Sequence, residues 1–265
     1  MTSAELVQTG QLEEGLAALQ TEIRAKPEDT RLRIFLFQLN CVLGRLDKAL
    51  TQLQVIASLN ADTMLLAQIF RPVLACEMLR REVFAGKRTP LIFGEPMEWM
   101  GSLIQANELV ARGEFAAAAD SRGKAFEAAP VSSGKINGEA FEWIADVDSR
   151  LGPMLEAFID GKYYWVPFSR IQKIETEKPS DLRDLVWMAA QFTWTNGGAA
   201  PGHIPARYPG TEDSSDGPLR LVRTTEWQEK PGETNLGLGQ RVLATDANEY
   251  PLLGCRSIEM NAVIA

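Results

Sequence analysis

Gly10-Gln-Leu-Glu-Glu-Gly15-Leu is the first of three related stretches in this chain; the others are Gly44-Arg-Leu-Asp-Lys-Ala49-Leu and Gly113-Glu-Phe-Ala-Ala-Ala118-Ala. Each has a glycine, a large apolar residue two places later and a small residue five places later. The first two glycines are 34 positions apart, and the third follows 69 positions later, close to twice that spacing. A period near 34 residues is typical of tetratricopeptide repeats, in which pairs of helices stack.

The residue types in this pattern suit a turn between two packed helices. A glycine ends a helix readily because it adopts a left-handed backbone conformation that other residues resist. The small residue at the fifth place, such as Ala49 or Ala118, lets the next helix approach its partner closely. A proline stands 17 positions after the glycine in the first and third copies, as Pro27 and Pro130, whereas the second copy has Ala61. The pattern therefore predicts a degenerate helical repeat.

Helices are expected throughout the first half of the chain, at 2–9, 12–25, 31–43, 46–59, 63–85, 97–111 and 115–128. Asp29-Thr30 and Asp62-Thr63 supply capping residues where helices should begin. The helix at 63–85 is long for a repeat helix. Pro72 inside it predicts a kink, because proline lacks the backbone donor and clashes with the preceding turn.

The composition changes after Pro130, where aromatic residues, glycine and proline become frequent. Asp160-Gly161 stands between two apolar runs and predicts a hairpin of strands 154–159 and 162–168. Further strands are expected at 140–145, 185–194, 219–223, 239–245 and 253–260. The expected fold class is α+β: a tetratricopeptide-like helical domain at 1–130, a linker at 131–138, and a mainly β domain at 139–265 with one or two short helical turns.

Charge and hydropathy argue against several classes of partner. The net charge of −8 and the pI near 4.9 repel nucleic acid and anionic membrane surfaces. We expect no membrane span, because the most apolar stretch, Met64 to Cys76, is short and contains Arg71. Cys41, Cys76 and Cys255 are far apart and form no metal-like or redox-like pair, so a reducing cytoplasm is the simplest location.

The sequence offers little for catalysis. Its one histidine, His203, lies in a proline-rich segment read as a loop, without a nearby nucleophile in sequence. There is no phosphate-binding GxxxxGK[ST] motif, and the glycines at 232, 237 and 239 read as turn residues, so we expect no cofactor. The many aromatic residues of the second half are expected to form a β core, with a partly exposed peptide groove as the alternative.

Asp146-Val-Asp148-Ser-Arg150 is the best acidic cluster. Two carboxylates on one face of a strand could hold a hard cation or perform acid–base work, and Glu156 or Asp184 would have to complete such a site. The competing interpretation is structural, because arginine binds carboxylates in bidentate pairs inside proteins. We favour the structural interpretation and keep a metal-dependent hydrolase using Asp146 and Asp148 as an alternative.

A second charged motif, Asp181-Leu-Arg-Asp-Leu-Val-Trp187, belongs to the same question. If this segment is a strand, Arg183 and Asp184 face opposite ways and cannot easily pair with each other. We therefore expect Arg183 to meet Asp146 or Asp148. The predicted structural charge network consists of Asp146, Asp148, Arg150, Arg183 and Asp184.

An ordered series of motifs resembles the ImpE/TagJ family: Phe141-Glu-Trp-Ile-Ala-Asp-Val-Asp-Ser-Arg-Leu-Gly-Pro153, Gly161-Lys-Tyr-Tyr-Trp-Val-Pro-Phe168, Asp181 to Trp187, Ala206-Arg-Tyr-Pro-Gly210 and Gly239-Gln-Arg241. The N-terminal half is also similar, in Arg31 to Leu39 and in Arg80-Arg-Glu-Val-Phe-Ala-Gly86. The resemblance covers nearly the whole chain, and the series is more specific than any single motif.

The resemblance implies a non-catalytic cytoplasmic adaptor of the bacterial type VI secretion system, with a helical domain and a second domain containing a β-sheet. It implies that the small contractile-sheath subunit is a partner, bound through a short helix that lies in a groove, and that sheath recycling by the AAA+ unfoldase is assisted. The unfoldase is itself a candidate partner. The resemblance brings no cofactor and does not identify the partner-binding surface. A scaffold for another complex remains a further alternative.

Overall fold

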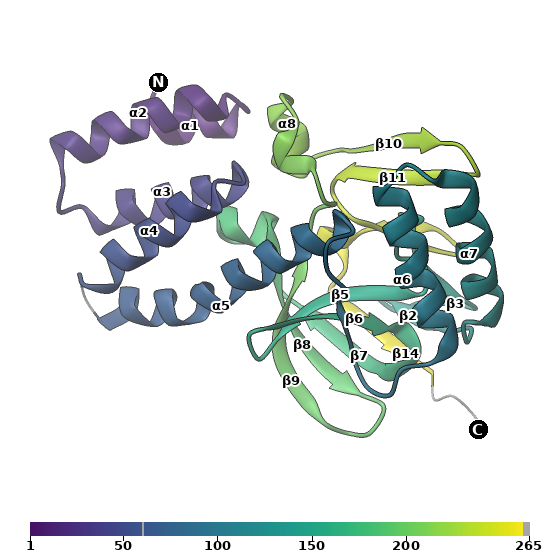
Figure 1. Cartoon of the computed structure of the whole chain (residues 1–265). Helices are drawn as coiled ribbons and strands as arrows, with labels where there is room; N and C mark the ends of the chain where they lie inside the picture. Colours follow the sequence, from purple (N-terminus) through teal and green to yellow (C-terminus); the bar gives the residue numbers. More distant parts are fainter. Residues whose placement is uncertain (60, 262–265) are drawn as a thin grey trace.

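The computed structural model describes residues 1–59 and 61–261, and its helices precede a largely β region, which confirms the α+β class (Figure 1). The last four residues of the expected β domain lie outside the described part. The helices of the first half are α1 (Ser3–Gln8), α2 (Leu12–Ala25), α3 (Thr30–Val42), α4 (Leu46–Ala57), α5 (Ala61–Phe84), α6 (Glu98–Ala111) and α7 (Phe115–Ala128). Their ends lie within two residues of the predicted ones.

The repeat pattern is explained by the turns between helix pairs. Gly10, Gly44 and Gly113 have φ angles of 87°, 69° and 77°, which is the left-handed region favoured by glycine. The small residues of the pattern are buried against neighbouring helices, Ala49 and Ala118 with no exposed surface at all. The predicted roles of the glycine and of the small residue are both confirmed.

The helices do not form one continuous stack. Helices α1 to α5 pack one after another, whereas α6 and α7 form a hairpin that lies beside the β region (Figure 1). The long helix α5 runs from the helical layer to the sheet and thereby joins the two. It contains Pro72, as expected, and the predicted kink at that residue stays a prediction.

Most described strands belong to a nine-stranded sheet with the order β1-β6-β5-β9-β8-β7-β14-β2-β3. Its strands are β1 (Leu91–Ile92), β2 (Gly134–Ile136), β3 (Glu139–Phe141), β5 (Met154–Ile159), β6 (Lys162–Pro167), β7 (Ile171–Thr176), β8 (Trp187–Trp194), β9 (Ala199–Pro205) and β14 (Ser257–Met260). β1 runs parallel to β6, and the other pairings in this sheet are antiparallel. The predicted β5–β6 hairpin is confirmed, with Asp160 and Gly161 both at positive φ.

Two smaller sheets complete the β region. β10 (Thr225–Lys230) pairs with β11 (Thr234–Gly239), and β12 (Val242–Thr245) lies between β13 (Glu249–Pro251) and β4 (Ile144–Asp146). The predicted strand at 140–145 is thus divided between β3 and β4, which belong to different sheets. The predicted strands at 239–245 and 253–260 begin later than expected, with β12 and β14 respectively.

Two predictions for the β region are wrong. Residues 219–223 are not a strand, because Pro218 lies in the first turn of the short helix α8 (Gly217–Arg220) and the chain then turns. His203 does not lie in a loop but in β9. Prolines are tolerated there because β9 pairs with β5 only at Gly202 and His203, so the missing donor of Pro201 is not needed on that side.

Both faces of the sheet carry buried core residues, although Ala189 and Gln191 of β8 are exposed. Phe158, Tyr163, Trp165 and Trp187 share one core with helices α1 to α7, whereas the opposite face packs with β12 and with the turn at Leu252–Gly254. Aromatic residues are therefore mainly core, although Trp143 and Trp227 are 41% and 36% exposed. The domain boundaries stay a prediction; the expected linker at 131–138 includes strand β2, and β1 lies within the expected helical domain.

Candidate partner-binding cleft and the buried charge network

A cleft of about 740 Å³ lies between the middle of α5 and the face of the sheet formed by β5, β9, β8 and β7. The α5 side is lined by Gln68, Ile69, Pro72, Val73 and Cys76. The sheet side is lined by residues from four strands or strand ends: Phe158, Asp160 and Gly161, then 175–177, 189–191 and 201–203. We call this space the α5 cleft.

The apolar surface of the α5 cleft is exposed on one face of the helix. Ile69 is 45% exposed, and Leu65, one turn earlier on the same face, is 57% exposed. Pro72 continues this face at the next turn and is also exposed. The opposite wall includes the small residues Ala189 and Gly202, which leave room above the sheet. A contiguous exposed apolar stripe is a candidate surface for binding another protein.

His203 forms part of the floor of this cleft. Its imidazole packs edge-on to Phe70 on α5, with the ring centroids 5.6 Å apart. Burial lowers the pKa of His203, and the carboxylate of Asp184 offsets this only in part. The imidazole is therefore neutral at pH 7 and belongs to the apolar surface.

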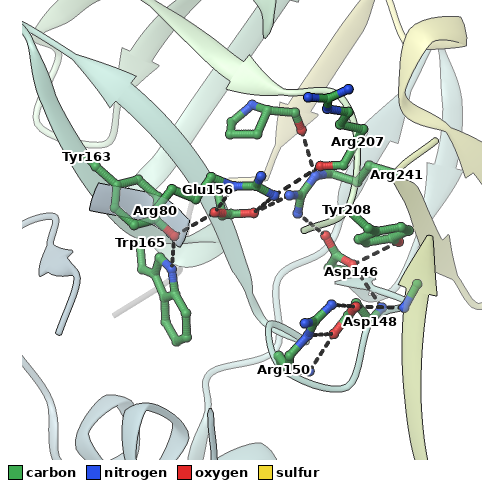
Figure 2. A network of polar contacts seen from close by, with 12 residues as sticks. Arg80, Asp146, Asp148, Arg150, Glu156, Tyr163, Trp165, Arg207, Tyr208 and Arg241 are labelled. Carbon is green, nitrogen blue, oxygen red and sulfur yellow. Dashed lines mark hydrogen bonds and ion pairs between the residues drawn. The ribbon is translucent and has the colours of Figure 1, made fainter. Parts of the chain in front are cut away.

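Beneath the other end of α5 lies a chain of fully buried charges (Figure 2). Arg80 on α5 makes a bidentate ion pair with Glu156 on β5, at 2.7 Å and 2.9 Å. Arg241 bridges Glu156 and Asp146 on β4 with its two terminal nitrogens. Tyr163 donates a hydrogen bond of 2.5 Å to Glu156. The network thus ties α5 to β5 and to the small sheet.

The two linked carboxylates differ in acidity because they differ in partners. Burial alone would raise the pKa of Glu156, but the guanidinium groups of Arg80 and Arg241 hold it near 2. Asp146 has one guanidinium partner, so burial prevails and raises its pKa to about 6. Tyr208 also donates to Asp146, at 3.1 Å.

The predicted network is only partly assembled as expected. Asp148 and Arg150 form a bidentate pair at 2.8 Å and 2.5 Å, and the amide of Asp148 donates to Asp146 at 2.9 Å. The structure therefore brings Asp146, Asp148 and Arg150 together. It adds Arg80, Glu156 and Arg241, which the predicted network lacks.

The prediction that Arg183 meets Asp146 or Asp148 is wrong. Arg183 pairs with Asp181, lies 3.8 Å from Asp184, and stacks over Phe70 at 5.0 Å. The reason is local: residues Leu182–Leu185 form a 3₁₀ turn, capped by Asp181, in place of the expected strand. In a turn, neighbouring charges can face the same side, so Arg183 and Asp184 need no distant partner.

This arrangement favours the structural interpretation of the acidic cluster. The carboxylates of Asp146 and Asp148 both bind guanidinium groups inside the protein. Within the described ranges, no group of three or more His, Cys, Asp or Glu side chains lies where it could hold a metal ion. The described helices also include none that is long and apolar enough to cross a membrane.

A second set of arginines binds the C-terminal end of α3. Arg207 donates to the carbonyls of Val42 and Cys41 at 2.7 Å and 3.1 Å, and Arg81 donates to that of Gly44 at 3.1 Å. Arg220 approaches the carbonyl of Leu43 at 3.4 Å. Cations stabilise the carbonyl end of a helix, where the last C=O groups lack intrahelical partners.

Sequence reasoning missed the roles of these arginines and of the α5 cleft. Arg80, Arg207 and Arg241 stand inside the motifs quoted for the family resemblance, which was the available signal. For the cleft, the signal was the stretch Met64 to Cys76, which is apolar on more sides than one packed helix can bury.

Comparison with known proteins extends over both halves of the chain. Residues 138–259 match a family model described as ImpE protein. The type VI secretion system accessory component TagJ of Pseudomonas aeruginosa is 44% identical over 259 residues, which cover 98% of this chain and 91% of that protein. The crystal structure of protein VPA1032 from Vibrio parahaemolyticus has a TM-score of 0.90 and 25% sequence identity, covering 99% of this chain and 98% of that chain.

Proposed function

This chain belongs to the ImpE family, and from that premise we propose that it is a non-catalytic adaptor of the type VI secretion system. In this proposal it works in the cytoplasm, binds a short helix of the small contractile-sheath subunit, and assists the recycling of contracted sheath by the AAA+ unfoldase. The name of its relative TagJ, an accessory component of that system, supports the general role. The partner and the binding surface are our proposal.

The observation that carries this proposal is the exposed apolar stripe of α5 formed by Leu65, Ile69 and Pro72, of which Ile69 and Pro72 line the α5 cleft. An amphipathic helix binds a protein groove by laying its apolar face into it, and its anchors recur at every third or fourth residue. Leu65, Ile69 and Pro72 have the matching spacing on the receiving side. The buried ion pair of Arg80 with Glu156 holds the wall of the cleft in place.

The proposal is tested by calorimetry of the full-length chain with the N-terminal helix of the cognate small sheath subunit. Ile69→Glu places a charge on the apolar stripe and should reduce affinity at least about tenfold, because a buried unpaired charge is costly. Met78→Glu is the matched control: Met78 is 47% exposed on the same helix but outside the cleft, so binding should persist. Absence of binding by the unmodified chain at high micromolar concentration would contradict the proposal.

The role in recycling has its own test. Contracted sheath, the unfoldase and ATP are combined with the unmodified chain or with Ile69→Glu, and the release of sheath subunits is followed over time. We expect sheath subunits to be released faster with the unmodified chain than with Ile69→Glu. If sheath subunits are released equally fast with and without the chain, the proposed role in recycling is contradicted, whereas the proposed sheath binding still stands. Failure of both assays would favour the alternative of a scaffold for another complex.

A further inference from the structure

The partner helix of the α5 cleft has a recognisable charge pattern, and this inference rests on the cleft assigned in the proposed function. We infer that the cleft selects an amphipathic helix whose apolar face is bordered by lysine or arginine near both ends. Asp160 and Glu177 are the residues that would set this preference.

The lining is acidic. It contains the carboxylates Asp160, Glu175 and Glu177, and no lysine or arginine among its described residues. Lys173 pairs with Glu175 at 2.9 Å and neutralises it in part. Asp160 and Glu177 are exposed, and within residues 1–59 and 61–261 neither has an ion-pair partner. Two free negative charges therefore border an apolar surface.

The strand register places these charges at opposite ends of the cleft. Ile159, Gly202, Ala190 and Thr176 are neighbours in one line across β5, β9, β8 and β7. Asp160 adjoins the first residue of this line, and Glu177 adjoins the last. Three interstrand spacings of about 4.8 Å separate the two ends by roughly 14 Å. A helix rising 1.5 Å per residue covers that distance in about ten residues.

The walls favour a helix as occupant over an added strand. The sheet side of the cleft is a face of strands β9 and β8. β8 pairs with β7 and β9, and β9 pairs with β8 and, at Gly202 and His203, with β5. Strand addition needs a free edge, and at Gly202 and His203 both edges of β9 are already paired. The opposite wall is an α-helix with exposed apolar residues at successive turns, the surface against which a second helix packs.

The experiment uses three synthetic helices of about 18 residues with the same apolar face and with lysine, glutamine or glutamate at two bordering positions about ten residues apart. Binding to the full-length chain is measured by fluorescence anisotropy at low and high salt. We expect affinity to fall in the order lysine, glutamine, glutamate, with about tenfold between the extremes at low salt and less at high salt.

The protein variants identify the residues responsible. Asp160→Asn with Glu177→Gln should remove the preference for lysine, and asparagine keeps the positive φ that the hairpin turn needs. Glu226→Gln with Glu249→Gln is the control, since both residues are exposed carboxylates outside the cleft, and it should keep the preference.

Equal affinity for the three helices would overturn the charge inference and leave the cleft as a docking site. Binding that survives Ile69→Glu would show that the helices bind elsewhere and would overturn it as well. Self-association that Ile69→Glu abolishes, seen by sedimentation, would mean that a second copy of this chain occupies the cleft. Because these helices are not taken from the sheath, their behaviour is independent of whether the sheath subunit is the natural partner.

Discussion

The arginines at the end of α3 show how single residues join distant parts of this chain. Arg207 is 1% exposed, and its guanidinium binds the carbonyls of Val42 and Cys41; that of Cys41 also accepts a hydrogen bond from the amide of Gly44, at 3.1 Å. Arg207→Ala would leave the carbonyl of Val42 buried without the bond from Arg207 and would weaken the pairing of Glu212. We expect it to lower the free energy of unfolding by about 3–5 kcal/mol. Urea denaturation measures this loss, and Arg24→Ala, at an exposed site on α2, should change stability by no more than about 0.5 kcal/mol.

Asp146 gives the stability of this protein an unusual pH dependence. Its folded-state pKa of about 6 lies above the ordinary 3.8, so between those values the folded state binds the proton more tightly than the unfolded chain. This contribution to stability is present below about pH 4 and is lost as the pH rises through 6. The test compares the free energies of unfolding of the native chain and of Asp146→Asn. The difference, native minus variant, should decrease by about 2–3 kcal/mol between pH 4 and pH 7. A difference that stays constant over this range would contradict the assignment.

The charged motifs show where residue-level prediction works and where it fails. The pairing of Asp148 with Arg150 is local and could be anticipated from their spacing. The partners Glu156 and Arg241 are 85 residues apart, and only the fold reveals that they meet. The partner of Arg183 was predicted wrongly because the composition of its segment suits a strand. In the structure, Asp181 and Asp184 cap a 3₁₀ turn there.

Among the elements, the repeat helices were the most predictable. A glycine at positive φ and a buried small residue are each required by local geometry, so they leave a periodic signal. The short strands β1, β2 and β13, of two or three residues each, carry weak signals and were not predicted; the six-residue strands β7, β10 and β11 were not predicted either. β9 was missed because its prolines argue against a strand unless the pairing of its neighbours is known.

Helix α4 provides a test of the repeat interpretation. Ala49 has no exposed surface and lies where α4 packs against its neighbours. Ala49→Leu adds three carbon atoms to this contact and should destabilise the protein by about 1–3 kcal/mol. Ala117→Leu, on the exposed face of α7, is the control and should have little effect. An unchanged melting temperature for Ala49→Leu would mean that the close helix contact does not limit the side chain.

At the scale of the whole molecule, helices and sheet share one core and one buried charge network. We therefore expect them to unfold together in spite of the proposed division at 131–138. Helix content, followed by circular dichroism, and tryptophan fluorescence should give the same midpoint in urea, because two-state unfolding makes different probes coincide. Five of the six tryptophans lie after residue 138, so fluorescence reports mainly on the β region. Two separated midpoints would show that the halves are independent domains.

The α5 cleft could not have been located from sequence. Its apolar stripe was visible in Met64 to Cys76, but a stripe becomes a binding surface only where the fold leaves it uncovered. The opposing wall is built from four segments between residues 158 and 203, whose alignment depends on strand register. Register is set by the whole sheet and leaves little trace in any one strand.

The contact between Arg207 and α3 also affects how the protein is made. The carbonyl of Val42 and its arginine partner are 165 residues apart, so at about 5–20 residues per second the ribosome needs roughly 10–30 seconds to supply the second after the first. During that interval the end of α3 is outside the exit tunnel without its final cap. The helical repeat, although synthesised first, matures only when the last quarter of the chain arrives, and nascent chains stalled before Arg207 should be cut by protease near residues 41–44.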